Sequence, residues 1–176
     1  EFLRDVAYSG GQFCYTTNWP ENTPGTWGMQ GAGALCLQLL GYGHVRPVLN
    51  STARIRELHT VEWKDLHRYH RDRNPLYNWY YETQAMFHRG VNSWRDWNEV
   101  FSKVIVENQQ EDGHWECPGG RYASHPEYDS YYSTCLAALS LQVYYRYLPT
   151  TKKPEEIGAR EESVLDAATE GLEILD

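Results

Sequence analysis

A loop followed by an apolar stretch occurs twice in this chain, and this repeat constrains the fold more than any other feature. Residues 109–115 read Gln-Gln-Glu-Asp-Gly-His-Trp, and a weaker copy at residues 10–15, Gly-Gly-Gln-Phe-Cys-Tyr, lies about a hundred residues earlier. Each loop precedes an apolar stretch, and residues 34–39 match residues 138–143 at an offset of 104. A middle stretch, residues 81–85, matches residues 132–136 at an offset of 51. A period near fifty residues predicts an all-α fold of stacked helical hairpins.

Three strongly apolar helices are expected. The first runs from about Thr26, its N-cap, to Leu40, with Gly41 as its C-terminal stop. Its leucines leave almost no polar face, which predicts burial on most sides. The second covers residues 76–89 between Pro75 and Gly90. The third covers residues 130–147, with Asp129 as N-cap. Residues 48–59 and 93–109 are amphipathic and predict outer helices, wet on one face.

Composition excludes several classes of protein. The 176 residues suffice for one domain with a real core. A net charge of −8 argues against a nucleic-acid partner, because phosphates require clustered Lys and Arg. No apolar run is long enough to span a bilayer. The chain begins with Glu1 rather than Met, so we expect a processed product or a piece of a longer protein, such as a secreted or periplasmic one.

The chain divides into a repeat domain, residues 1–149, and an acidic C-terminal helix or tail, residues 150–176. The tail is expected to be a solvated end helix or an extension that docks on a partner. Cys36 and Cys135 lie in apolar stretches and are expected to be buried thiols. Cys14 and Cys117 occupy equivalent loop positions, and the sequence does not decide whether they form a disulfide.

The loop at residues 109–115 resembles the Gln-x-x-x-Gly-x-Trp motif of squalene–hopene and oxidosqualene cyclases. The match covers Gln109, Gly113 and Trp115, and Asp112 is also typical of the motif. Residues 132–141 resemble an inner helix of the same superfamily, which includes the protein prenyltransferase beta subunits. The resemblance implies an (α/α) toroid, or part of one, in which the Gly turns the chain, the Gln caps backbone groups and the Trp wedges between hairpins.

The sequence lacks the known catalytic motifs of that superfamily. The cyclases' Asp-x-Asp-Asp, the prenyltransferases' zinc-binding Asp-x-Cys and the thioester Cys-Gly-Glu-Gln of complement domains are all absent from the sequence. Ser133 stands where the resemblance would place the zinc-binding His. The chain also supplies only about half the helices of a complete toroid. We therefore expect either part of a longer chain or an array that completes itself by self-association.

Aromatic residues provide the expected ligand surface. In a toroid the inner helices point the same way, so their N-terminal ends gather at one mouth. Those ends carry several Trp and Tyr residues, of which Trp27, Trp79, Tyr80, Tyr131 and Tyr132 are the candidate ligand-binding residues. The competing interpretation is that the tryptophans and Tyr132 simply pack between hairpins. An aromatic cavity of this kind would hold a small molecule, such as an isoprenoid, a peptide or a glycan.

Two carboxylates, Glu82 and Asp129, are candidates for acid–base catalysis because both fall near inner-helix starts. Asp129 has the competing role of N-cap. A metal site at residues 67–72 is disfavoured by the flanking arginines, so neither a metal nor another cofactor is expected. The leading hypothesis is a non-catalytic, cyclase/prenyltransferase-like toroid domain that binds a ligand or partner. The alternative is a diverged enzyme acting on an isoprenoid or a polysaccharide.

Overall fold

The computed structural model describes residues 2–3, 7–15, 27–58, 61–63, 74–119 and 126–146, without the side chains at positions 27, 58, 126–129, 145 and 146. This part of the chain is mostly helical, which confirms the all-α class. A short antiparallel hairpin, which the sequence pattern did not predict, pairs β1 (Tyr8–Ser9) with β2 (Gln12–Phe13). The acidic tail and the histidines at 67 and 70 lie outside the described residues.

The first apolar helix, α1 (Trp27–Leu39), ends where the sequence predicts. Gly41 takes a φ of 85°, a left-handed conformation that glycine adopts without steric cost. The Gly41 N–H donates to the Gln38 carbonyl at 2.9 Å, and the Tyr42 N–H donates to the Leu37 carbonyl at 2.8 Å. This pair of bonds is a Schellman motif, which satisfies two carbonyls at the end of the helix.

The middle apolar helix, α3 (Pro75–Arg89), also has the predicted bounds. Asn74 is its N-cap and accepts a hydrogen bond from the Leu76 N–H at 2.9 Å. Pro75 takes the first helical position, where a missing N–H costs nothing. Gly90, with a φ of 109°, ends α3, and α4 (Val91–Glu107) begins directly after it.

The third apolar helix departs from its prediction. It is α5 (Pro126–Leu141), followed by a separate short helix, α6 (Val143–Arg146). The expected start at residue 130 is therefore wrong by about a turn, and Asp129 lies inside the helix rather than at its N-cap. Pro126 explains the difference, because proline is well suited to the first turn of a helix.

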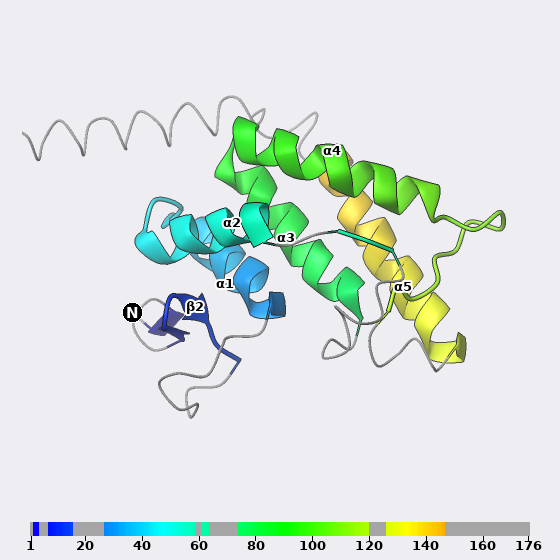
Figure 1. The fold of residues 1–176 in the computed structure, drawn as a ribbon, viewed down its shortest axis with the longest axis horizontal. Coiled ribbons are helices and arrows are strands. Elements are labelled where there is room, and N and C mark those ends of the chain that lie inside the picture. The colour runs from blue at the N-terminus through cyan, green and yellow to red at the C-terminus, as the bar shows by residue number, and fades with distance from the viewer. Residues whose placement is uncertain are drawn as a thin grey trace, which may run out of the picture.

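The helices form two layers. α1, α3 and α5 lie side by side with α3 in the middle, and their N-terminal ends point towards the lower part of Figure 1. α2 (Arg46–Leu58) packs on α1 and α3, α4 packs on α3, and these two helices also touch each other. Both amphipathic stretches therefore form the expected outer helices. The short hairpin packs against α1 and α2.

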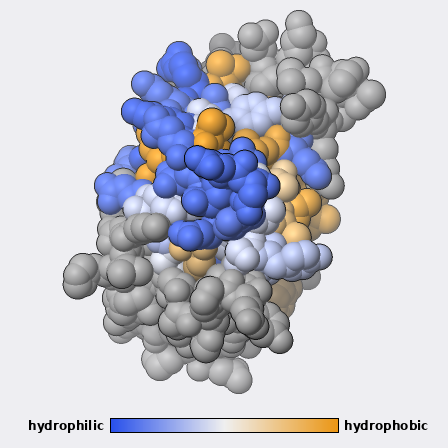
Figure 2. All heavy atoms as spheres, turned by 90° about the vertical axis from the view of Figure 1, so that its right-hand side faces the viewer, coloured by the Kyte–Doolittle hydropathy of each residue, from blue (hydrophilic) through white to orange (hydrophobic). Residues whose placement is uncertain are grey.

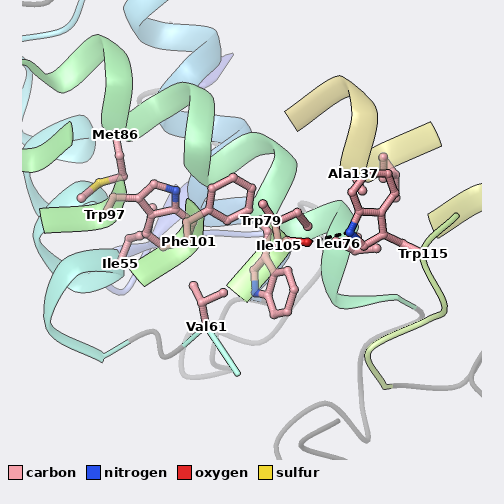
Figure 3. Packing of buried hydrophobic residues seen from close by; sticks show 11 residues of the cluster. Ile55, Val61, Leu76, Trp79, Met86, Trp97, Phe101, Ile105, Trp115 and Ala137 are labelled. Atoms are coloured by element: carbon pink, nitrogen blue, oxygen red, sulfur yellow. Dashed lines mark hydrogen bonds between the residues drawn. The ribbon is translucent and has the colours of Figure 1, made fainter. Parts of the chain in front are cut away.

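The larger hydrophobic cluster lies between the layers, around the side chain of Trp79 in α3 (Figure 3). From α4 it receives Trp97, Phe101 and Ile105, which recur at helical spacing, while Glu99 on the opposite side of that helix is exposed. The ring of Trp97 stacks on Phe101 with centroids 5.9 Å apart. This burial confirms the amphipathic stripe read from the sequence.

Glycines set the distance between α1 and its neighbours. A Cβ built on Gly31 would lie 2.7 Å from the backbone nitrogen of Glu82, and one on Gly33 would lie 2.3 Å from the ring of Phe13. Gly28 would likewise meet the side chain of Asn78 at 2.4 Å. These glycines therefore permit the close packing of α1 against α3 and the hairpin.

Burial of α1 on most sides is confirmed, but one side of its C-terminal half is exposed. Leu39 is 66% exposed and Leu40 is 64% exposed. Cys36 and Cys135, predicted to be buried thiols, are both exposed. The reason for the exposure on α1 is tertiary, because α3, α2 and the hairpin cover the other sides of this helix but not the side with Cys36 and Leu39. All four cysteines are free, so Cys14 and Cys117 form no disulfide.

Candidate functional site

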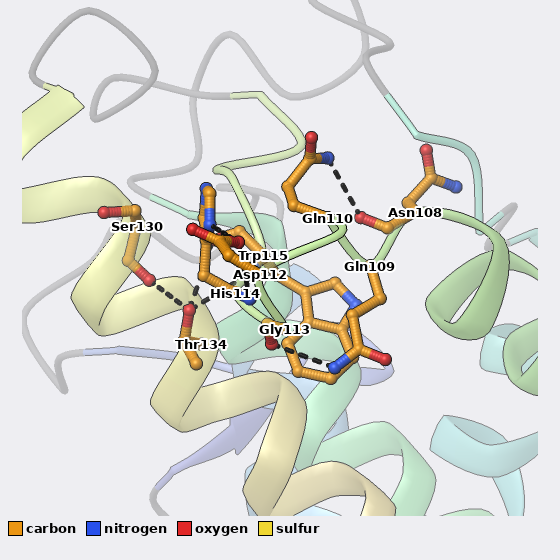
Figure 4. Close-up of polar contacts among 9 residues, drawn as sticks. All are labelled: Asn108, Gln109, Gln110, Asp112, Gly113, His114, Trp115, Ser130 and Thr134. Carbon is orange, nitrogen blue, oxygen red and sulfur yellow. Dashed lines mark hydrogen bonds and ion pairs between the residues drawn. The ribbon is translucent and has the colours of Figure 1, made fainter.

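The loop at 108–114, which follows α4, is closed by its own hydrogen bonds (Figure 4). The Gln109 side chain donates from Nε2 to the Gly113 carbonyl at 2.9 Å, and Gly113 takes a φ of 93°. The Gln110 N–H donates to the His114 carbonyl at 2.9 Å. The Gln109 side chain thus binds the backbone at Gly113, where the chain turns.

Asp112 and His114 form the most polar contact of this loop. His114 Nδ1 lies 2.5 Å from Asp112 Oδ1, and the same carboxyl oxygen accepts the His114 N–H at 3.3 Å. These hydrogen bonds from His114 lower the pKa of Asp112 below its ordinary value. Both side chains remain accessible at the surface, where Asp112 fixes the local turn.

Trp115 joins α4 to α5. Its indole is 5% exposed and donates from Nε1 to the Ile105 carbonyl at 2.7 Å, while its backbone N–H donates to Thr134 Oγ1 of α5 at 3.0 Å. The last carbonyls of a helix lack intrahelical partners. Asn108 Nδ2 satisfies the Val104 carbonyl in the same turn at 2.9 Å, so the indole completes the cap of α4.

The weaker copy of the loop, which lies in the β1–β2 hairpin, shares two local features with residues 109–115. Gly11 takes a φ of 80°, and Phe13, two residues later, is buried as Trp115 is. The Phe13 N–H donates to Gln30 Oε1 of α1 at 3.3 Å, and Gln30 Nε2 donates back to the Phe13 carbonyl at 3.2 Å. In both places a polar side chain of the following helix binds the backbone of a buried aromatic residue.

The predicted ligand-binding aromatic residues differ in their exposure to solvent. Trp79 is fully buried in the core and stands 6.0 Å, centroid to centroid, from Trp63, so it belongs to the packing rather than to a ligand surface. Tyr80 is half-buried against the same core. Tyr131 is 78% exposed and Tyr132 is 39% exposed. The side chain of Trp27 lies outside the described residues.

Neither candidate acid lies at a described surface. Glu82 is fully buried in α3, where it faces α1 at Gly31. The side chain of Asp129 is not among those described. Among the described residues there is also no group of three or more His, Cys, Asp or Glu side chains that could hold a metal ion.

The accessible side of α3 is made of tyrosines. The ring of Tyr81 meets Tyr77 and Tyr80 edge to face, each with centroids 5.0 Å apart. Burial, with the neighbouring Tyr77 and Tyr80, raises the pKa of Tyr81 to about 12, so its hydroxyl stays protonated at neutral pH. The sequence pattern predicted Tyr80 as a ligand-binding residue but not Tyr81. The spacing of Tyr77 and Tyr81, one helical turn apart, was the signal that could have found the pair.

This tyrosine cluster (Tyr77, Tyr80 and Tyr81) carries no charge of its own. The one acidic residue of α3, Glu82, is turned into the protein. Phenolic side chains offer an apolar ring for stacking and a hydroxyl that both donates and accepts. The cluster is therefore suited to a neutral ligand with polar groups.

Comparison of the chain with protein-family models, with curated proteins and with solved structures finds no match in any of the three. Within the part of the chain that the structure describes, no helix is both long and apolar enough to cross a bilayer.

Proposed function

We propose that the chain is a non-catalytic helical module, a toroid or part of one in the manner of the cyclases and prenyltransferases, that binds a neutral ligand through its tyrosine cluster. The observation that carries the proposal is the exposed side of α3. Residues 75–87 of this helix are otherwise almost entirely buried, and the side left accessible presents Tyr77, Tyr80 and Tyr81. Clustered tyrosines are typical of surfaces that hold sugars or peptides.

The toroid part of the proposal is supported by local geometry. Three apolar helices lie side by side in one layer with amphipathic helices on the other side, as in stacked hairpins (Figure 1). The two glycine–aromatic loops, at Phe13 and at Trp115, hold the following helix by the same kind of hydrogen bond. The Gln109–Gly113 bond supports a structural role for the motif shared with the cyclases.

The charge of the protein favours a neutral ligand over an anionic one. A net charge of −8 repels phosphates and carboxylates unless basic side chains converge on the site. Neutral glycans satisfy this restriction, since they stack an apolar face on aromatic rings and hydrogen-bond with hydroxyl groups. Of the two candidate acids, Glu82 is fully buried, which disfavours it as a general acid for a ligand at the tyrosine cluster.

Saturation-transfer NMR with cellohexaose and chitohexaose as probes tests the proposal. We expect saturation transfer to sugar protons in the unaltered chain, with loss of the signal in Tyr77→Ala and in Tyr81→Ala. Tyr42→Ala is the matched control, because Tyr42 is 47% exposed but lies beyond the end of α1. Equal binding by all three variants would contradict the assignment to the tyrosine cluster. Hydrolysis of either oligosaccharide would contradict a non-catalytic role.

A further inference from the structure

α1 and α5 are the two end helices of the layer that α1, α3 and α5 form, and each has a solvent-exposed side without charged residues. α1 contains no Asp, Glu, Lys or Arg, and α5 contains none from residue 130 onwards. Yet Cys36 and Leu39 of α1 and Tyr131 and Cys135 of α5 are exposed. Helices that face water usually carry charges on that side, as α4 does. Figure 2, which views the α5 end of the molecule, shows apolar patches among hydrophilic ones.

The side of α1 that packs on α3 has its counterpart exposed on α5. α1 approaches α3 through Gly28 and Gly31, and Gln38 Nε2 donates to the Ala85 carbonyl of α3 at 3.0 Å. At the offset of 104 residues, the corresponding positions of α5 and of the junction that follows it are Tyr132, Cys135 and Gln142, all of which are exposed. We name this surface of α5 its leading face.

The reverse relation holds for α1. α5 meets α3 through Ser133, whose Oγ accepts from Asn74 Nδ2 at 2.9 Å, and through Leu136 in the hydrophobic cluster. The corresponding positions of α1 are Met29 and Ala32, which are half-buried, and the next turn is the exposed Cys36. We name this surface of α1 its trailing face. Each end of the layer thus presents the face that the other end uses against α3.

From this correspondence we infer that a second copy of this chain packs with its trailing face against the leading face of the first. Packing α5 on α1 in this way continues the arrangement of α1 on α3 and of α3 on α5. Neither face carries a charge, so the net charge of −8 does not oppose contact at the interface itself. Two copies related by a twofold axis would use both pairs of faces and leave neither open.

The side chains at the two faces are compatible with such contact. The leading face has the larger groups, Tyr132 and Cys135, where α1 has glycines. The trailing face is correspondingly small at Ala32 and Cys36. By analogy with the bond from Gln38 to the Ala85 carbonyl, the Gln142 amide would donate to the Ala32 carbonyl of the second copy. The inference rests on helix packing alone and does not depend on the proposed ligand.

Sedimentation velocity over a wide range of protein concentration, with the full chain and no ligand, tests the inference. We expect a reversible dimer that is weakened about tenfold or more by Cys36→Glu on the trailing face and by Cys135→Glu on the leading face, because each buries an unpaired charge. Both thiols are exposed in one copy, so neither change threatens the fold. Val106→Glu is the control, because Val106 is 62% exposed on α4, outside both faces.

Mixing the two variants distinguishes this arrangement from one in which the same helix of both copies forms the contact. A dimer of one Cys36→Glu copy and one Cys135→Glu copy has both glutamates in one interface and leaves the other interface unaltered. The mixture should therefore associate more tightly than either variant alone, because each variant's own dimer buries an unpaired charge in both interfaces. A symmetric contact between two α1 helices would be weakened by Cys36→Glu alone, and this result would overturn the inference. A chain that stays monomeric, with its own residues covering the faces, would overturn it as well.

Discussion

Replacement of Trp115 by Ala should destabilise the protein more than any other single change in the loop. The indole is 5% exposed and lies in the cluster that includes Leu76 and Ile105. Truncating a buried Trp to Ala costs about 3–5 kcal/mol, through lost transfer free energy and the cavity that remains. Part of this cost is the hydrogen bond from Nε1 to the Ile105 carbonyl.

Trp115→Phe separates the two contributions. Phenylalanine retains most of the apolar ring but cannot donate to the carbonyl, which then lacks a partner in the last turns of α4. Leaving a buried polar group unsatisfied costs about 1–3 kcal/mol. We therefore expect Trp115→Phe to fall between the unaltered chain and Trp115→Ala in free energy of unfolding.

Urea denaturation followed by far-ultraviolet circular dichroism measures these differences, with the slope of the free energy against urea checked for constancy. Tyr131→Ala is the matched control, since its ring is 78% exposed and its loss should change stability by less than about 0.5 kcal/mol. A loss of under about 1 kcal/mol in Trp115→Ala would refute the reasoning, because a buried indole cannot be removed so cheaply from a packed core. Equal losses for Ala and Phe would assign the whole effect to the hydrogen bond.

Three further changes test other parts of the structure. Gly31→Ala should destabilise by about 1–3 kcal/mol, because the added Cβ meets the Glu82 backbone and forces α1 away from α3. Asn74→Ala should cost a similar amount, about 1–3 kcal/mol, since it removes the cap of α3 and the bond to Ser133. His88, whose pKa is lowered by burial, should make the protein less stable as the pH falls through the ordinary histidine value of 6.5, because the unfolded chain then binds more protons than the folded one.

Each of these has a result that would contradict it. An alanine in an exposed helix normally stabilises relative to glycine by up to about 1 kcal/mol, so a gain in Gly31→Ala would disprove the close approach of α1 and α3. Asn74→Asp keeps the capping oxygen but loses the donor to Ser133, and it should recover part of the loss. For His88, thermal unfolding between neutral and mildly acidic pH should show a weaker pH dependence in His88→Gln. An unchanged dependence would assign it to another group.

The sequence predicted those elements whose boundaries are set by local chemistry. Gly41 and Gly90 end their helices because each takes a positive φ that other residues adopt only at a cost. Pro75 begins α3 for an equally local reason. The stripe of Trp97, Phe101 and Ile105 gave the buried side of α4, since helical spacing alone decides which side chains share a face.

Exposure of an apolar helix could not be predicted, because it depends on which neighbours are present. α1 has no polar side by composition, yet Leu39 stands in solvent since no described element covers it. The same limit applies to Trp79 and Glu82. One was expected at a ligand surface and the other was considered for catalysis, but both point into the protein because α3 is enclosed by the helices around it.

The sequence by itself therefore determined that this chain is helical, where most helices end, and that a glycine–aromatic loop precedes an apolar helix twice. These properties follow from backbone conformation and from periodicity, which act over a few residues. Only the tertiary structure decided that Trp115 completes the cap of α4, that Tyr77, Tyr80 and Tyr81 share the accessible side of α3, and that Cys36 of α1 and Cys135 of α5 are exposed. Those properties arise between segments far apart in the chain, where packing rather than local preference determines which side chains meet.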